Sequence, residues 1–181
     1  MDKRQAIIEA ATELFAVRGF HGTPVPSIAE KAGVAVGTIY RHFPDKERLA
    51  SEAYCHWKSA ATKAVLAVYN RVLAPREQFG RSWRAMCAFA LEHSAAIRFT
   101  EMQAGPYLDE PAHAACRRYD NLLLEFCRSI APDDQTARLK ATAVNGVFLG
   151  MLKAIWEEEL PDLADILNSV EEICWNIISE Q

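Results

Sequence analysis

The chain has no apolar run long enough to cross a bilayer. A membrane-spanning helix needs about 20 consecutive apolar residues, whereas the best candidate, residues 141–156, contains Asn145 and Lys153. That segment is better interpreted as a buried helix. The first residues, Met1-Asp2-Lys3-Arg4, open a helix of mixed charge and not a hydrophobic signal core. We therefore expect a cytoplasmic protein without a membrane partner.

Cysteine and histidine occur without the spacing of a metal or catalytic site. The chain has five cysteines and no CxxC pair, which argues against a disulfide framework or a zinc site. The five histidines are dispersed, and none is followed by a metal-ligating residue at position i+4. No Ser/His/Asp or paired-carboxylate constellation is present either. We expect no metal, no cofactor and no enzymatic activity, and most cysteines should be small buried hydrophobic residues.

Strand-like runs of Val, Ile and Thr are also missing, and glycine and proline are concentrated at a few sites. Apolar residues instead recur every three to four positions, which predicts an all-α fold of about nine helices. The expected N-caps are Asp2, Thr23, Asp45 and either Asp133 or Asp134. The expected helices lie at about 3–18, 24–33, 36–43, 46–69, 75–90, 95–103, 111–131, 134–160 and 162–177, with Gln5 completing a capping box in the first.

Residues 19–49 contain the most specific pattern, two short helices around a glycine-containing turn. The first helix should end at Gly33, where a left-handed backbone is favourable without a β-carbon. In the second, Ile39 and Phe43 are four residues apart and form a buried ridge. The residues left pointing outward are Val36, Gly37, Thr38, Tyr40 and Arg41. A short helix with a small, hydrogen-bonding outer face fits the DNA major groove, so the pattern predicts a helix-turn-helix.

The order of these residues resembles the DNA-binding domain of the TetR/AcrR family of bacterial transcriptional regulators. After an amphipathic first helix come Gly19-Phe20, Thr23, Ile28-Ala29, Ala32-Gly33-Val34, Gly37-Thr38-Ile39-Tyr40, His42-Phe43, Lys46 and Leu49. The resemblance covers about residues 3–50. It implies a DNA-binding domain at 1–50 and an effector-binding and dimerisation domain at 51–181, with the boundary region inside the fourth helix.

The resemblance also implies which residues contact DNA. Thr38 and Tyr40 offer hydroxyl groups, His42 offers a ring N–H, and Lys46 is a cation at a helix N-terminus. The alternative is that Tyr40 packs on the first helix and His42 caps a carbonyl. Arg41 is either a guanine or phosphate contact or a solvated surface arginine. The predicted set is Thr23, Val36, Gly37, Thr38, Tyr40, Arg41, His42 and Lys46.

Two features depart from the family pattern or give it little support. Ala35 stands where Ser or Thr is common, so that cap and phosphate contact are absent, and Val36 and Gly37 make the front of the helix apolar. Readout there is expected to rely on contact with thymine methyl groups. The net charge of −4 is unfavourable for a DNA binder. Residues 1–50 contain seven Lys and Arg against six Asp and Glu, so +1, and the remainder carries −5.

The C-terminal region is where this family binds small molecules. Aromatic and apolar residues of helices five to eight can line a pocket, with polar residues that interrupt the apolar faces as further markers. The alternative is plain core packing for the apolar residues and ordinary hydrogen bonding for the polar ones. The predicted effector residues are Trp83, Phe89, His93, Phe99, Glu101, Met102, Tyr119, Phe126 and Phe148.

Small residues form a ridge on the eighth helix. Glycine in a helix interior costs about 1 kcal/mol against alanine, which indicates that another helix packs closely there. Together with the apolar stripe of the last helix, the ridge predicts a homodimer interface of four helices, matched to a palindromic operator. Packing of the same two helices within one chain is the alternative. The predicted interface residues are Ala143, Gly146, Gly150, Leu163, Ile166, Val170, Ile173 and Ile177.

These patterns favour a homodimeric, ligand-responsive transcriptional repressor that binds a double-stranded operator and is released by an unidentified small molecule. An activator of the same fold remains open. A helical enzyme, a small-molecule carrier without DNA function, and a helical adaptor that binds protein are the other hypotheses.

Overall fold

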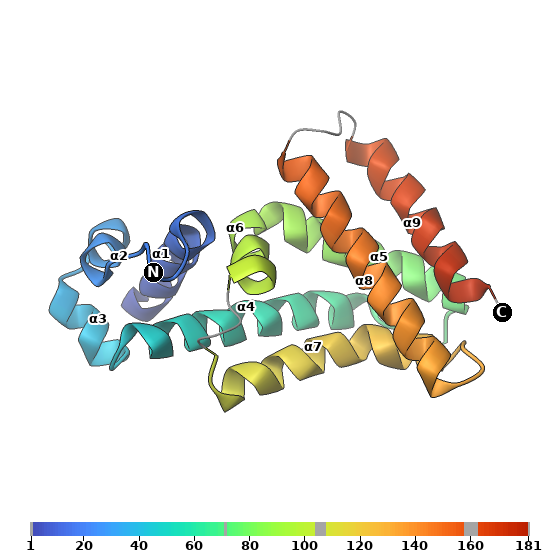
Figure 1. The fold of residues 1–181 in the computed structure, drawn as a ribbon, viewed down its shortest axis with the longest axis horizontal. Coiled ribbons are helices and arrows are strands. Elements are labelled where there is room, and N and C mark those ends of the chain that lie inside the picture. The colour runs from blue at the N-terminus through green and yellow to red at the C-terminus, as the bar shows by residue number, and fades with distance from the viewer. Residues whose placement is uncertain (1, 71, 104–107, 158–162, 181) are drawn as a thin grey trace. The chain divides into compact units, whose positions relative to one another are not determined.

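The computed structural model describes residues 2–70, 72–103, 108–157 and 163–180. All regular elements within these ranges are helical, which confirms the all-α prediction, and Figure 1 shows their arrangement. Their bounds are α1 Lys3–Arg18, α2 Val25–Ala32, α3 Val36–His42, α4 Lys46–Val68, α5 Pro75–Glu92, α6 Ser94–Arg98, η1 Phe99–Gln103, α7 Glu110–Arg128, α8 Asp134–Trp156 and α9 Leu163–Ser179. The side chains of Met102, Tyr119 and Leu163 lie outside the described part.

The helix ends largely follow the capping residues expected from the sequence. Asp2 accepts a hydrogen bond from the amide of Arg4, and Gly19 ends α1 with a positive φ of 69°. Gly33 ends α2 in the left-handed conformation at φ 65°, where a β-carbon is unfavourable. Asp45 accepts from the amide of Arg48 at 2.6 Å, and Asp133 caps α8 through the amide of Thr136 at 2.8 Å. Local chemistry therefore sets these boundaries.

Two local predictions were wrong. Thr23 does not cap α2, because the N-cap position of that helix is held by Pro24 without a side-chain hydrogen bond. Gln5 does not close a capping box, since its amide bonds Glu9 and His56 instead.

The helix expected at 95–103 is present as α6 followed directly by η1. The sequence did not indicate that η1 is a π-helical turn, a rare form that is found often at functional sites.

The chain divides into two compact units. Unit 1 comprises Met1–Ala61 and Ala90–Arg118, and unit 2 comprises Thr62–Phe89 and Tyr119–Gln181. The helices α4, α5 and α7 therefore each contribute residues to both units. Unit 1 contains the whole helix-turn-helix together with α6, η1 and the start of α7.

The core of unit 1 is built around Phe15, whose side chain is fully buried. Its ring centroid lies 5.7 Å from that of Phe20 and 5.5 Å from that of Phe99. Ile39 and Phe43 belong to the same buried cluster, so the ridge of the second short helix is fixed to α1 as its spacing predicted. Segments far apart in the sequence thus share one core.

Unit 2 has an aromatic core and a buried carboxylate. Phe79 stacks on Trp83 and on Phe126, at centroid distances of 6.0 and 5.9 Å. Glu171 in α9, only 5% exposed, accepts hydrogen bonds from Arg76 at 2.7 Å and Arg84 at 2.9 Å, both in α5. Because a buried carboxylate needs its partners, these arginines fix α9 on α5.

The thiols described in the structure are free, and most are inert by their surroundings. Cys87, Cys127 and Cys174 are buried. Burial raises the pKa of Cys87 and of Cys174 to about 12 and that of Cys127 to about 11. Because the thiolate is the reactive form, these cysteines are packing residues. No helix within the described ranges is long and apolar enough to span a membrane.

Replacing Phe15 by alanine should lower the free energy of unfolding by about 3–5 kcal/mol, because it removes a ring that fills the middle of the unit 1 core. Val17 is 80% exposed on the same helix. The control Val17→Ala should therefore change stability by no more than about 0.5 kcal/mol. Urea unfolding followed by circular dichroism measures both, and equal losses would contradict this description of the core.

Candidate nucleic-acid interface

The α3 helix is anchored on one face and open on the other. Ile39 and Phe43 are buried, and the amide of Phe43 donates to the carbonyl of Ile39 at 2.8 Å. The helix ends at Phe43, whose backbone is extended. No side chain caps its start, as expected from Ala35. The predicted contact residues Val36, Gly37, Tyr40 and Arg41 are exposed, and Thr38 and His42 are half-buried.

Nothing within the described chain requires a glycine at position 37. A β-carbon built there meets no atom within 4 Å, and the residue is not among the glycines with positive φ. Glycine in a helix costs about 1 kcal/mol relative to alanine. The open space over Gly37 is therefore available to something that approaches α3 from outside.

The structure bears on the alternatives in which Tyr40 packs on α1 and His42 caps a carbonyl. Tyr40 is 51% exposed, so much of its ring faces solvent. The Nε2 atom of His42 is buried and has no hydrogen-bond partner in the described structure. Because a buried unpaired N–H is costly, a proton on Nδ1 is favoured over one on Nε2. The ring then keeps an N–H donor at Nδ1.

Lys46 has a structural role that the sequence did not reveal. Its ammonium group donates to the carbonyls of Phe20 at 2.7 Å and Thr23 at 3.0 Å, and it lies 4.2 Å from the centroid of the Phe20 ring. It therefore ties the first turn of α4 to the connection between α1 and α2. An ammonium group has three donors, so one is left for a phosphate.

Thr23 is withdrawn from the predicted contact set. Its side chain is completely buried, and its hydroxyl donates to the carbonyls of Gly19 at 2.8 Å and Leu14 at 3.2 Å. A group enclosed in this way cannot reach a phosphate. The hydroxyl instead braces the turn that follows α1.

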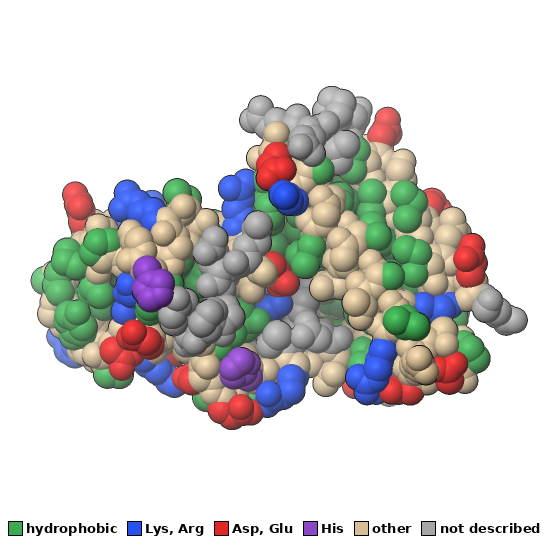
Figure 2. Space-filling model, viewed as in Figure 1, with side chains coloured by type: hydrophobic (Ala, Val, Ile, Leu, Met, Phe, Trp, Pro, Cys, Tyr) green, Lys and Arg blue, Asp and Glu red, His purple; other side chains and the backbone are tan. Residues whose placement is uncertain are grey.

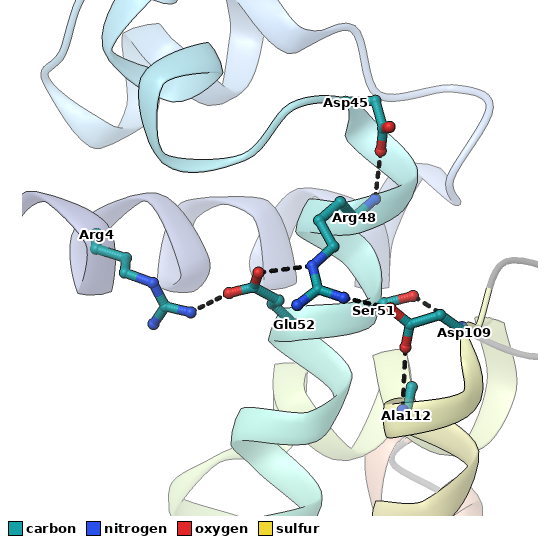
Figure 3. A network of polar contacts seen from close by, with 7 residues as sticks. All are labelled: Arg4, Asp45, Arg48, Ser51, Glu52, Asp109 and Ala112. Atoms are coloured by element: carbon teal, nitrogen blue, oxygen red, sulfur yellow. Dashed lines mark hydrogen bonds and ion pairs between the residues drawn. The ribbon is translucent and has the colours of Figure 1, made fainter.

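A polar network, also missed by the sequence reasoning, orients the first turns of α4 (Figure 3). Glu52 receives hydrogen bonds from Arg4 of α1 and, at 2.8 Å, from Arg48. Arg48 also donates to Asp109 at 2.6 Å, and the amide of Asp109 donates to Ser51 at 3.1 Å. Hydrogen bonding to Glu52 and its charge raise the pKa of Arg48. The network joins α1, α4 and the start of α7 within unit 1.

The predicted effector residues fall into both units. Trp83, Phe126 and Phe148 take part in the unit 2 core, where Trp83 and Phe148 meet edge to face at 5.7 Å, and Phe89 is buried. In unit 1, His93 lies 5.0 Å from the ring of Trp57 and Glu101 pairs with Lys58.

Phe99 is 2% exposed and stacks on Phe15 in the core of unit 1. The side chains of Met102 and Tyr119 lie outside the described residues. All nine effector residues stay predictions.

The predicted ridge on α8 is open. Ala143, Gly146 and Gly150 are exposed, and a β-carbon built on either glycine meets no atom within 4 Å. Packing against the described part of the chain therefore does not explain these glycines. Leu139, 65% exposed and four residues before Ala143, extends the ridge and was missed. Apolar side chains are visible over α8 and α9 in Figure 2.

On α9, Ile173 is 51% exposed and Ile166, Val170 and Ile177 are partly exposed. The side chain of the eighth predicted interface residue, Leu163, is not described. In the described residues, no group of three or more His, Cys, Asp or Glu side chains is placed to hold a metal ion.

Comparison with known proteins assigns both parts of the chain. Residues 7–53 match the family model "Bacterial regulatory proteins, tetR family", and residues 62–180 match "Tetracyclin repressor-like, C-terminal domain". The chain is 27% identical over 158 residues to the HTH-type transcriptional regulator LmrA of Bacillus subtilis, covering 82% of this chain and 84% of LmrA.

Solved structures agree. A TetR family transcription regulator from Shewanella sp. PV-4 is 25% identical, with a TM-score of 0.79 over 97% of both chains. The regulator FadR from Bacillus subtilis, in complex with stearoyl-CoA, shares the fold at 21% identity, with a TM-score of 0.79 over 98% of this chain and 99% of FadR. The two family models together span nearly all of the chain, which therefore belongs to the TetR family of bacterial transcriptional regulators, DNA-binding proteins with an N-terminal helix-turn-helix.

Proposed function

We propose that this regulator is a homodimeric repressor that binds a palindromic operator and is released by a small molecule. The observation that carries the proposal is the open outer face of α3, with exposed Val36, Gly37, Tyr40 and Arg41 on a helix whose other face is buried. A regulator of this kind acts in the bacterial cytoplasm, and its role requires binding and no catalysis.

Gly37 and its neighbours on α3 each make a different kind of contact with the operator. The missing β-carbon at Gly37 lets α3 approach the floor of the major groove, and Val36 contacts thymine methyl groups. Arg41 supplies a bidentate donor for guanine. Tyr40 and Thr38 supply hydroxyl groups to phosphate or base edges. The Nδ1–H of His42 and the remaining donor of Lys46 bind phosphate.

Dimerisation spaces two α3 helices for the two halves of the operator. The open positions Leu139, Ala143, Gly146 and Gly150 recur at intervals of four, three and four residues along α8, which is the spacing of a helix–helix seam. Residues Ile166, Val170, Ile173 and Ile177 repeat that spacing on α9. Two such faces related by a two-fold axis form a four-helix interface.

The effector is a small molecule with a large apolar part, recognised by the aromatic side chains of unit 2. The stearoyl-CoA bound to FadR supports an apolar ligand for this fold. Because α4, α5 and α7 have residues in both units, binding in unit 2 changes unit 1 through continuous helices. The result is a population shift away from the operator-competent state.

Selection from random double-stranded DNA tests the function. The protein should enrich a palindromic sequence and bind it far more tightly than scrambled DNA, with affinity that falls steeply as salt rises. Gel-shift titrations at two salt concentrations measure this. Failure to enrich any sequence, or equal affinity for the enriched and the scrambled DNA, would contradict the proposal.

The variant Gly37→Ala separates DNA reading from folding. Alanine should raise the free energy of unfolding by up to about 1 kcal/mol, because the site is open and alanine favours helix. It should weaken operator binding about tenfold or more, since the added methyl group overpacks the contact with the groove. Thermal unfolding and gel shifts on the same sample measure both. Unchanged affinity would show that α3 does not approach DNA at Gly37.

The variant Gly146→Leu tests the dimer face. The chain should remain folded, because the position is open, but the bulky side chain should weaken dimerisation about tenfold or more. Sedimentation equilibrium measures the dissociation constant. Ala88→Leu, at an exposed position of α5, is the matched control and should dimerise like the unchanged protein. A Gly146→Leu dimer of normal stability would place the interface elsewhere.

A further inference from the structure

The π-helical segment η1 belongs to the same packing unit as the helix-turn-helix. The family model for the C-terminal domain spans residues 62–180 and includes η1, whereas the structure groups η1 with unit 1. Phe99, the first residue of η1, is 2% exposed and stacks on Phe15 at 5.5 Å with an interplanar angle of 29°. A segment from the effector-binding part of the family thus completes the core of the DNA-reading unit.

An ion pair holds η1 on α4. The ammonium group of Lys58 donates to the carboxylate of Glu101, the third residue of η1. The Lys58 side chain is 4% exposed and that of Glu101 is 18% exposed. Removing one partner of such a pair leaves a poorly solvated charge, which costs far more than the loss of a surface pair. Lys58 also lies 5.7 Å from the centroid of the Tyr54 ring, another buried residue of α4.

The same stretch of α4 also holds α1. The indole N–H of Trp57 donates to the hydroxyl of Thr12 at 2.8 Å, and that hydroxyl donates to the carbonyl of Ile8. The ring of Trp57 also lies 5.0 Å from that of His93, at the start of α6. Adjacent residues Trp57 and Lys58 therefore connect α1 and the α6–η1 segment to one site on α4.

We propose that Lys58 and Glu101 are positioning residues for operator binding. Their ion pair fixes η1, which holds Phe99 against Phe15 and so fixes α1. Helices α2 and α3 pack on α1 in the same core, so displacement of Phe99 loosens the support of the reading helix. Because packed cores adopt discrete arrangements and do not deform continuously, the ion pair selects one orientation of α3. The part of this proposal that concerns operator binding rests on the proposed function.

The variant Glu101→Gln tests this proposal, since it removes the charge and keeps an acceptor for Lys58. Hydrogen exchange should become about tenfold faster in α1 and η1, because the local opening energy falls. Operator affinity should fall about tenfold. Glu171→Gln is the control, because it removes the charge of a buried carboxylate, 6% exposed, that is ion-paired in unit 2. It should leave exchange in α1 unchanged.

Exchange of the two charges, Lys58→Glu with Glu101→Lys, should restore protection of α1 and much of the operator affinity. If hydrogen exchange in α1 of the Glu101→Gln variant is as slow as in the unchanged protein, the proposal is wrong. It is also wrong if Glu101→Gln and Glu171→Gln change hydrogen exchange in α1 equally. If Glu101→Gln does not fold, the charge-swapped protein and Glu101→Asp decide by the same measurement. Failure of the unchanged protein to bind any operator would refute the proposed function, while exchange in α1 would still test the positioning role.

Discussion

The packing of the Phe15 ring against Phe20 and Phe99 is the contact on which the arrangement of unit 1 depends. Phe15 lies on α1, Phe20 leads into the helix-turn-helix, and Phe99 comes from a segment nearly 80 residues further along the chain. Fully buried rings leave little freedom to reorient in a close-packed core. Packing on α1 therefore fixes the position of the exposed face of α3, and packing on η1 helps to fix the position of α1.

Polar contacts around α4 add to the constraint that the aromatic core of unit 1 sets. Lys46 ties the start of α4 to the turn after α1. Arg48 links Glu52 and Asp109, which fixes the start of α7 on the same turns of α4. The ion pairs of Arg48 are partly exposed and individually weak. Their role is to choose one geometry for helices that the apolar core already holds together.

The sequence predicted what local chemistry decides. Asp2, Gly19, Gly33 and Asp133 end or begin helices through contacts with nearby backbone, so their roles were visible in the residue order. Lys46 was assigned to DNA, yet its partners Phe20 and Thr23 lie more than twenty residues away and no local pattern encodes them. The π-helical form of η1 was also missed. The enclosure of Thr23 was missed although the carbonyls that its hydroxyl binds, those of Gly19 and Leu14, are only four and nine residues away. Gly146 and Gly150 were singled out because glycine is unfavourable inside a helix, and Gly37 because it lies on the outer face of α3. A β-carbon built on any of the three meets no atom within 4 Å.

A double-mutant cycle between Phe15 and Phe99 tests the central claim most directly, because it measures the contact that joins α1 to η1. The free energy of unfolding is measured for the unchanged protein, Phe15→Leu, Phe99→Leu and the double variant. The account predicts that the losses are not additive, with a coupling energy of about 1 kcal/mol between the two rings. Losses that add to within about 0.3 kcal/mol would contradict it, since the two residues would then stabilise the protein independently.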